Sequence, residues 1–402
     1  MSVRWRQLAW LSVAELLALS LWFSASAVLP ALAREWQLGD VGRAWLTNAV
    51  QLGFIVGTLG SALGNLPDVW SPRRLMMVSA VAGAVANAAV AVWVDSLAPA
   101  LILRFVTGIS LAGAYPPAMK VMATWFREGR GLAIGILIGA LTVGSATPHL
   151  IRGVTDLPWR HTLLAASLLA LLSALIVARF VEEGPYRFPS ARFDVRMATL
   201  VLRERGARLA CFGYFGHMWE LYAMWTWIAV FLAESLAARG GGTYAGLNAS
   251  GATFVVIASG ALGCWLGGML ADRCGRTTET IAAMALSGLC ALGIGTTFGR
   301  APTLTLLVAI VWGIAVIADS AQFSTAVTEL STPAYVGTAL TMQTCVGFAI
   351  TIVSIWLIPL VAQAVGWQWA FAALAPGPFL GIAAMARLRG LPESVKLAGG
   401  RR

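Results

Sequence analysis

The stretch Gly268-Met269-Leu270-Ala271-Asp272-Arg273-Cys274-Gly275-Arg276 lies between two long apolar segments in the second half of the chain. A divergent copy, Gly64-Asn65-Leu66-Pro67-Asp68-Val69-Trp70-Ser71-Pro72-Arg73-Arg74, precedes it, and the glycine and aspartate of the two copies are each separated by 204 positions. Two further patterns recur at nearly the same interval: Glu15-Leu16-x-Ala18-x-x-x-Trp22 returns as Glu220-Leu221-x-Ala223-x-x-x-Trp227, and Gly108-Ile109 returns as Gly313-Ile314. The sequence therefore predicts two homologous halves.

The composition indicates an integral membrane protein. Hydrophobic residues make up 58% of the 402 positions and charged residues 11%, and the mean hydropathy is +0.78, far above the average for soluble domains. Apolar runs of about 20 residues, the length that a helix needs to cross a bilayer, recur along the chain. We expect twelve spans, at about 8–32, 44–66, 75–94, 97–123, 131–151, 162–180, 209–233, 249–270, 280–298, 303–326, 336–361 and 369–386.

The charge distribution predicts the orientation and the domain organisation. The basic residues behind the net charge of +10 are scattered between apolar runs, unlike those of a nucleic-acid-binding surface. Because Lys and Arg favour the cytoplasmic side of a membrane, we expect both termini to be cytoplasmic, in a bacterial inner membrane. An arginine-rich polar stretch divides the chain into an N-terminal six-helix bundle (1–181), a cytoplasmic linker (182–208) and a C-terminal six-helix bundle (209–402). The five cysteines have no metal-site spacing, and we expect neither metal nor cofactor.

The loop motif resembles the GxLaDrxGRr motif that follows the second helix in the major facilitator superfamily of secondary transporters. The second copy matches closely, whereas the first departs from the pattern at Pro67 and Pro72. The resemblance implies an all-α integral membrane fold of twelve transmembrane helices in two pseudo-symmetric six-helix bundles, with a solute site between them. It also implies a gating latch at the cytoplasmic surface, the alternative being a solvated loop. The latch residues are Gly64, Asp68, Arg73, Arg74, Gly268, Asp272, Arg273, Gly275 and Arg276.

Ionisable residues inside the predicted spans are few. Each costs about 3 kcal/mol or more at the bilayer centre unless a partner, water or a function compensates. They fall on helices 1, 4, 7 and 10, which the resemblance implies line the central cavity. These ionisable residues, together with a lysine at the inner end of helix 4, form the candidate path of solute and protons. The path consists of Glu15, Arg104, Lys120, His217, Glu220 and Asp319.

Arg104 lies in Leu101-x-x-Arg104-x-x-Thr107-Gly108, which resembles the family's helix 4 motif LxxRxxqG. The resemblance implies that this arginine pairs with an acid on helix 1, here Glu15, and releases it when a proton or solute competes. Alternatively, Arg104 forms a fixed salt bridge or a backbone cap that holds helix 4. Lys120 either faces the solute or extends to the cytoplasmic surface.

His217 and Glu220, at positions i and i+3, lie on one side of helix 7. A histidine beside a carboxylate in a low-dielectric cavity suits a proton relay, and the alternative is a hydrogen-bonded pair that only holds the helix. Asp319 begins a polar patch in helix 10. It either contacts solute or a proton, or satisfies the backbone of a neighbouring helix.

Together these features predict a secondary active transporter that works by alternating access, is coupled to protons and carries a small organic anion. The alternative is proton-driven efflux of hydrophobic or cationic compounds, which the buried acids would attract. We expect no enzyme, since neither an HExxH motif nor a paired nucleophile and base occurs, and no GxxxxGK[ST] loop is present for ATP. The expected partners are a small-molecule solute, protons and membrane lipids, without nucleic acid, and a monomer is sufficient to form the pathway.

Overall fold

The computed structural model describes residues 2–126, 130–155, 157–186, 203–332 and 336–401, with the backbone alone at residues 67, 68, 130 and 131. Within these ranges the chain is almost entirely helical, apart from connecting loops and an isolated bridge between Tyr244 and Leu247. Apolar runs adopt helices because a helix satisfies its backbone hydrogen bonds internally, as a bilayer requires.

The first half begins with an interrupted helix made of α1 (Val3–Leu19), α2 (Ser24–Ala27) and α3 (Leu29–Glu35). The other crossings consist of α4 (Asp40–Leu63), α6 (Pro72–Trp93), α7 (Leu97–Ala112), α8 (Tyr115–Ala123), α9 (Arg130–Val154) and α10 (Trp159–Phe180). The fourth crossing is divided into α7 and α8. A single turn, α5 (Leu66–Val69), separates the second crossing, α4, from the third, α6.

The second half begins with the longest described helix, α12 (Arg205–Ala238), which runs without interruption for 34 residues. The helices that follow are α13 (Ala249–Ala258), α14 (Gly260–Cys274), α15 (Arg276–Gly293), η1 (Ile294–Thr297), α16 (Pro302–Ala318), α17 (Ser320–Leu330), α18 (Val336–Val365), α19 (Trp367–Ala370), η3 (Phe371–Leu374), α20 (Pro376–Arg389) and η4 (Pro392–Gly400). Two later crossings are each divided into two helices: α13 is followed directly by α14, and α16 by α17.

The predicted spans agree with the observed helices. In the described residues, 11 continuous or nearly continuous helices are long and apolar enough to cross a membrane. The interrupted unit α1–α3 accounts for the remaining predicted span, and it falls short of a continuous span because its helix is broken after Leu19. The all-α membrane fold is therefore confirmed, with a number of crossings close to the expected twelve.

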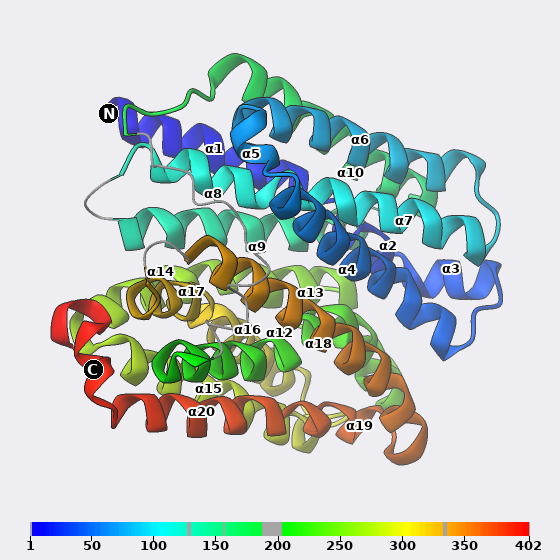
Figure 1. The fold of residues 1–402 in the computed structure, drawn as a ribbon. Coiled ribbons are helices and arrows are strands. Elements are labelled where there is room, and N and C mark those ends of the chain that lie inside the picture. The colour runs from blue at the N-terminus through cyan, green and yellow to red at the C-terminus, as the bar shows by residue number, and fades with distance from the viewer. Residues whose placement is uncertain (1, 127–129, 156, 187–202, 333–335, 402) are drawn as a thin grey trace.

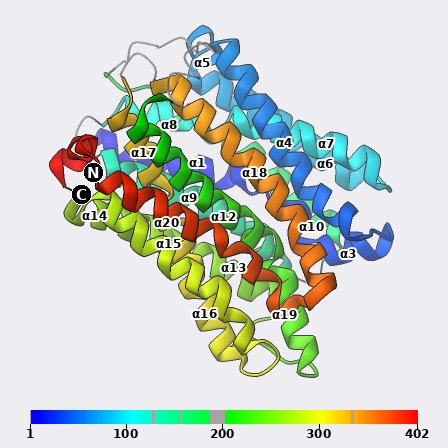
Figure 2. The same cartoon turned by 60° about the horizontal axis from the view of Figure 1, so that its bottom comes forward.

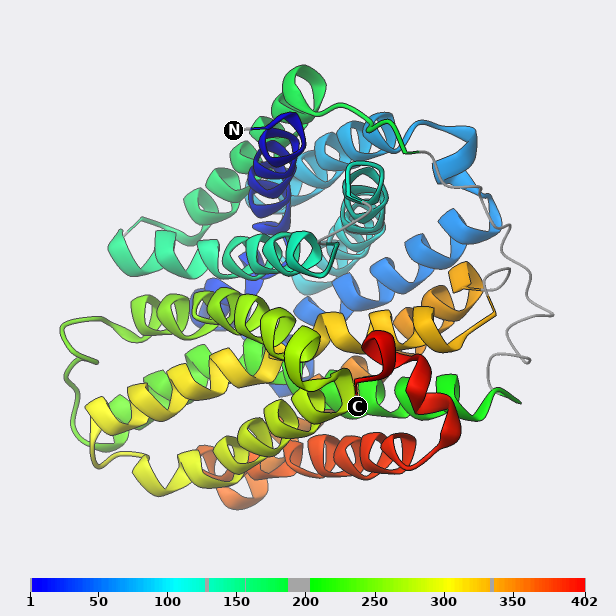
Figure 3. The ribbon, with the colours of Figure 1, turned by 90° about the vertical axis from the view of Figure 1, so that its left-hand side faces the viewer.

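The helices form two bundles that follow the two halves of the sequence (Figure 1). Both chain ends lie at the same end of the bundles, which we call the terminal side (Figures 1 and 3). Two helix contacts join the bundles: α4 lies along α18 (Figure 2), and α9 lies along α13 and α14 (Figure 3). The interface between the bundles therefore runs along two pairs of opposed helices.

Glycines permit the close approach of α9 to its partners. A Cβ atom at Gly135 would lie 3.1 Å from the carbonyl oxygen of Cys264, and one at Gly153 would lie 2.7 Å from the backbone nitrogen of Gly251. Small residues are the usual means of close helix packing in membranes, where burial of apolar surface provides little driving force.

Most of the linker predicted at 182–208 lies outside the described residues, since 187–202 are not described. The described start of this segment passes close to the terminal side of α8, where Gly184 N donates a hydrogen bond of 2.6 Å to Thr124 Oγ1. The proposed division at 1–181 and 209–402 remains a prediction.

Candidate functional site

Three interruptions near the middle of the helices position the polar side chains. They lie between α1 and α2, between α7 and α8, and at Asp319 between α16 and α17. The second contains Pro116 and Pro117 in the first turn of α8, where a missing N–H is tolerated. A broken helix leaves carbonyl oxygens without their usual donors. Buried side chains beside the breaks are therefore needed as donors.

Arg104 fills the first of these breaks. It is fully buried, and its guanidinium donates hydrogen bonds to the carbonyl oxygens of Leu21, at 3.0 Å, and of Trp22. A further bond of 3.4 Å reaches the carbonyl of Leu46 on α4. The C-terminal end of a helix carries a partial negative charge, so a permanently charged side chain is well suited to hold these carbonyls.

Asn87 extends the network of Arg104 to other helices. Its side-chain oxygen accepts bonds from Arg104, at 3.1 Å, and from Ser24, at 2.7 Å. Its amide nitrogen donates to the carbonyl of Leu163, at 2.8 Å, and to Ser167, at 3.0 Å. The network joins α2, α6, α7 and α10, so Arg104 braces the interrupted first crossing.

The predicted pairing of Arg104 with Glu15 is not formed. All the hydrogen bonds of Arg104 in the described residues go to backbone carbonyls, Ser24 or Asn87. The pairing was wrong because the sequence could not indicate that the first helix breaks at this depth and presents its carbonyls to α7. The hydrogen bonds of Arg104 to backbone carbonyls agree with the alternative prediction, in which Arg104 caps a helix backbone.

Glu15 is buried on α1, and within the described structure neither of its carboxyl oxygens has a hydrogen-bond partner. It borders a cavity of about 10 Å³, together with Ala80, Ala114 and Ser173. A space of this size accommodates about one water molecule. An ionised carboxylate in such a place is costly, and a proton on Glu15 removes that cost.

His217 on α12 and Asp319 at the joint of α16 and α17 lie in direct contact in the protein interior. His217 Nδ1 lies 2.8 Å from Asp319 Oδ1, and the two side chains are 1% and 2% exposed. The two atoms are close, but in the described residues Asp319 Oδ1 accepts no aligned hydrogen bond. His217 Nε2 also has no hydrogen-bond partner in the described residues. The pair connects an unbroken helix to a broken one.

Glu220 does not pair with His217, which corrects one alternative for helix 7. Its two oxygens accept hydrogen bonds from Ser287 Oγ, at 2.8 Å, and from Trp312 Nε1, at 2.7 Å. Although i and i+3 side chains lie on one side of a helix, they diverge by about 60°. His217 is directed to the α16/α17 joint, and Glu220 to α15 and α16.

Glu279, in the first turn of α15, is a buried acid that the sequence reasoning missed. Its side chain is 5% exposed, and its Oε2 has no hydrogen-bond partner among the residues described. A signal was available, because Glu279 follows the loop motif by three residues and begins an apolar run. It was overlooked because the predicted span began at Thr280.

An aromatic cluster lies between the bundles and was also missed as a unit. The ring centroids of Trp22 lie 5.5 Å from Tyr222 and 5.6 Å from Phe348, and Phe54 lies 4.5 Å from Phe348. Two buried glutamines, Gln51 on α4 and Gln343 on α18, have no hydrogen-bond partner for their amides in the described chain. These residues come from four crossings: the α1–α3 unit, α4, α12 and α18. The spacing of residues in the sequence could not indicate that these four crossings meet.

The second loop motif is held by Arg276. Its guanidinium binds Glu329 with two bonds of 2.8 and 2.7 Å and Gln322 with one of 2.8 Å, which links α15 to α17. Glu329 also accepts a bond of 3.1 Å from the backbone nitrogen of Ala398. Gly275 supplies the turn before α15 with a φ of +92°.

The other motif residues take different roles. Asp272 and Arg273 are exposed, and the backbone carbonyl of Asp272 accepts a bond from Arg401. In the first copy, Arg73 donates to the carbonyls of Val177, at 3.0 Å, and Ala178 at the end of α10. The side chain of Asp68 lies outside the described residues. Of the remaining motif residues, Gly64 and Arg74 are exposed and Gly268 is buried. Lys120, which belongs to the candidate path, is half-buried on α8.

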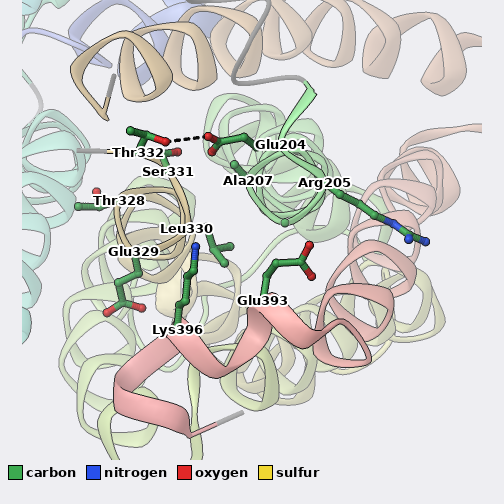
Figure 4. A pocket seen from close by; sticks show the side chains of 11 residues that line it. Glu204, Arg205, Ala207, Thr328, Glu329, Leu330, Ser331, Thr332, Glu393 and Lys396 are labelled. Atoms are coloured by element: carbon green, nitrogen blue, oxygen red, sulfur yellow. Dashed lines mark hydrogen bonds between the residues drawn. The ribbon is translucent and has the colours of Figure 1, made fainter. Parts of the chain in front are cut away.

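A separate pocket of about 560 Å³ opens beside α12, α17 and η4 (Figure 4). Charged groups of both signs line it, including Arg205, Glu329, Glu393 and Lys396, and Glu204 accepts a bond of 3.0 Å from Thr332. Its lining contains none of the residues of the candidate path. In the described residues no group of three or more His, Cys, Asp or Glu side chains is arranged for a metal ion.

Two helical bundles with broken, polar-lined crossings define a membrane transport protein. A family model described as the Major Facilitator Superfamily matches residues 11–342, and the chain belongs to that superfamily.

The chain is similar to a probable sulfoacetate transporter of Cupriavidus necator, with 27% identity over 54% of each chain. It is also similar to a 4-hydroxybenzoate transporter of Pseudomonas putida, with 30% identity over 44% of this chain and 37% of that protein. These matches therefore span about half or less of the length of the curated relatives. A solved structure of the human organic anion transporter MFSD10 has a TM-score of 0.70 at 16% identity, covering 96% of this chain and 100% of that one, and supports the fold.

Proposed function

We propose that this protein is a proton-coupled secondary transporter of a small organic anion, working by alternating access. The observation that carries the proposal is the buried pair of His217 and Asp319, 2.8 Å apart at the joint of α16 and α17. Histidine is the side chain whose ordinary titration lies nearest to physiological pH. A proton arriving at this pair changes its charge, and with it the attraction between α12 and the joint.

Glu15 is the corresponding proton site of the N-terminal bundle. Its unpartnered carboxyl group faces a water-sized cavity, so protonation removes the cost of an isolated buried charge. Arg104 holds the broken first crossing in place around this site and does not itself bind the solute in this conformation. Glu220 supports α15 and α16, and Lys120 stays a candidate solute contact.

The solute class is supported by the relatives, which include proteins named for sulfoacetate and 4-hydroxybenzoate, both organic anions. The unpartnered amides of Gln51 on α4 and Gln343 on α18 offer hydrogen-bond donors for such a molecule, and the rings of Trp22 and Phe348 between the bundles offer apolar walls. We place the solute between the bundles at this level.

The second candidate is proton-driven export of a hydrophobic or cationic compound. One observation favours it: Arg104 is committed to carbonyl oxygens, whereas Glu15 has no partner in the described chain. A central site with an available acid and an occupied arginine suits a cation better than an anion.

We further propose that the loop motifs are gating latches at the cytoplasmic surface of a bacterial inner membrane, where both termini lie. Arg276 and Arg73 tie neighbouring helix ends. Within the described residues Asp272 takes part through its backbone carbonyl alone, so Asp272→Asn leaves this contact in place. A monomer provides the whole pathway.

The experiment uses proteoliposomes of the purified protein with an internal pH dye and a panel of sulfoacetate, benzoates, nitrate and lipophilic cations. The organic-anion proposal requires that an organic anion drives acidification in the direction of its own movement. If only lipophilic cations move, with protons moving the opposite way, the export alternative replaces it. If no solute moves protons, proton coupling is wrong.

A further inference from the structure

Glu279 is a buried carboxyl group outside the proposed coupling pair. It lies at the terminal side of α15, in the first turn after the loop motif, and is 5% exposed. Its Oε2 has no hydrogen-bond partner in the described structure. An acid in this condition is strongly disfavoured as an anion unless its immediate neighbours compensate.

The side chain of Glu279 lies beside Gly267 of α14. A Cβ atom at Gly267 would overlap the carbonyl oxygen of Ala318 and lie 2.9 Å from Glu279 Oε1. The two oxygens therefore border the same small space. Ala318 is the last residue of α16, and the next residue, Asp319, carries the pair with His217. The carboxyl group of Glu279 thus lies at the joint of the broken helix.

Two oxygens that share such a space attract each other only when one of them carries a hydrogen atom. A protonated Glu279 has a hydrogen to donate into this space, and the carbonyl of Ala318 is an acceptor that borders it. An ionised Glu279 repels the carbonyl and also faces Asp319 as a like charge. The proton on Glu279 therefore determines whether α15 attracts or repels the joint.

The other charged and titratable groups around Glu279 do not neutralise it. Arg276, on the same helix, acts as an opposite charge, but its guanidinium is bound to Glu329 and Gln322. Cys264 on α14 is buried within electrostatic range, and as a neutral thiol it provides no counter-charge. Asp319 of the joint is within electrostatic range of Glu279 as a like charge, and it is also in contact with His217.

We propose that Glu279 is a further proton-binding residue, which holds α14, α15 and the α16/α17 joint together when protonated and releases the joint when ionised. Because Glu279 lies between Asp319 and the terminal end of α15, it also offers the proton a route between the coupling pair and that side of the protein. Only an O–H bond is broken and another formed, with the proton exchanging with water at the terminal side. This inference rests on the proposed proton coupling.

The first test compares the full-length protein with Glu279→Gln in proteoliposomes, using the organic anion that the solute panel identifies. Glutamine keeps a hydrogen-bond donor permanently, so we expect proton-driven accumulation to fall by about tenfold or more. Solute-for-solute exchange without a pH gradient should stay within about twofold of the wild type. Glu234→Gln, at an exposed site near the end of α12, is the matched control. Unchanged accumulation in Glu279→Gln overturns the inference.

The second test is independent of transport. Thermal unfolding of the detergent-solubilised protein is followed from about pH 5 to about pH 9, a range that spans titration of perturbed carboxyl groups. The wild type should lose Tm as the pH rises, because ionisation removes the donor to Ala318, and Glu279→Gln should show a flatter curve. Coincident curves contradict the inference. If the wild type moves no protons with any solute, the proposed function fails, and this comparison still decides whether Glu279 binds a proton.

Discussion

His217 Nδ1 lies 2.8 Å from Asp319 Oδ1, at the point where an unbroken helix meets the joint of a broken one. α12 runs through its bundle without interruption, whereas α16 ends and α17 begins at Asp319. Residues that absorb backbone changes during domain movement are commonly found at the ends of such elements. In the proposed mechanism the pair converts a change of proton occupancy into a change at the joint.

Replacement of His217 tests the pair through transport. We expect His217→Gln to reduce proton-driven accumulation by about tenfold or more, because glutamine cannot carry a proton, while exchange in the absence of a gradient continues. His161→Gln, at an exposed position, serves as the control. Equal losses of accumulation and exchange would instead indicate a purely structural histidine.

Arg104 should be more important for stability than for solute affinity. Arg104→Met removes the donor to the carbonyl of Trp22 and the charged donor to the carbonyl of Leu21 and the side-chain oxygen of Asn87, which keep only Ser24 as a partner. We expect the unfolding free energy to fall by about 3 kcal/mol, because several buried acceptors lose a charged partner at once. Thermal unfolding in detergent measures this. If the variant had an unchanged Tm and a large loss of solute affinity, Arg104 would be a solute-binding residue and not a structural brace.

Glu220→Gln is expected to be mild. The amide can still accept a hydrogen bond from Trp312 and remains within bonding distance of Ser287, so the contacts between α12, α15 and α16 survive. Accumulation and Tm should therefore both stay close to the wild type, with proton-driven uptake within about twofold. Loss of proton-driven uptake with exchange retained would make Glu220 a titrating residue of the cycle.

The link between Arg276 and Glu329 is suited to a double-mutant cycle. The side chains are 10% and 25% exposed, so solvent screens the pair only partly. We expect Arg276→Gln, Glu329→Gln and the double variant to give a coupling free energy of about 1 to 2 kcal/mol from chemical or thermal unfolding. A coupling near zero would mean that the two helices are held by their other contacts and that the motif is no latch.

The fold was accessible from the sequence because bilayer spanning imposes a simple rule. Runs of apolar residues long enough to cross the membrane must form helices. The predicted limits of the fourth span, 97 to 123, therefore coincide with those of α7 and α8 together (Leu97–Ala123). The internal repeat and the loop motif then placed these helices in two halves.

The candidate site was only partly accessible. Buried ionisable residues such as Asp319 stand out in an apolar span, but their partners depend on where helices break and which helices meet. The pairing of His217 with Asp319 joins residues about a hundred positions apart, and Arg104 binds carbonyls that exist only because the first helix is interrupted. Glu279 was hidden by its position at the edge of a predicted span.

The central claim is that the pair of His217 and Asp319 exchanges a proton when solute binds. The most direct measurement is the number of protons taken up or released when the identified solute is added to detergent-solubilised protein in weakly buffered solution containing a pH indicator. The wild type should exchange protons with the medium, and Asp319→Asn should bind solute with little or no proton change. The same proton change in Asp319→Asn as in the wild type, or none in the wild type, would contradict the account.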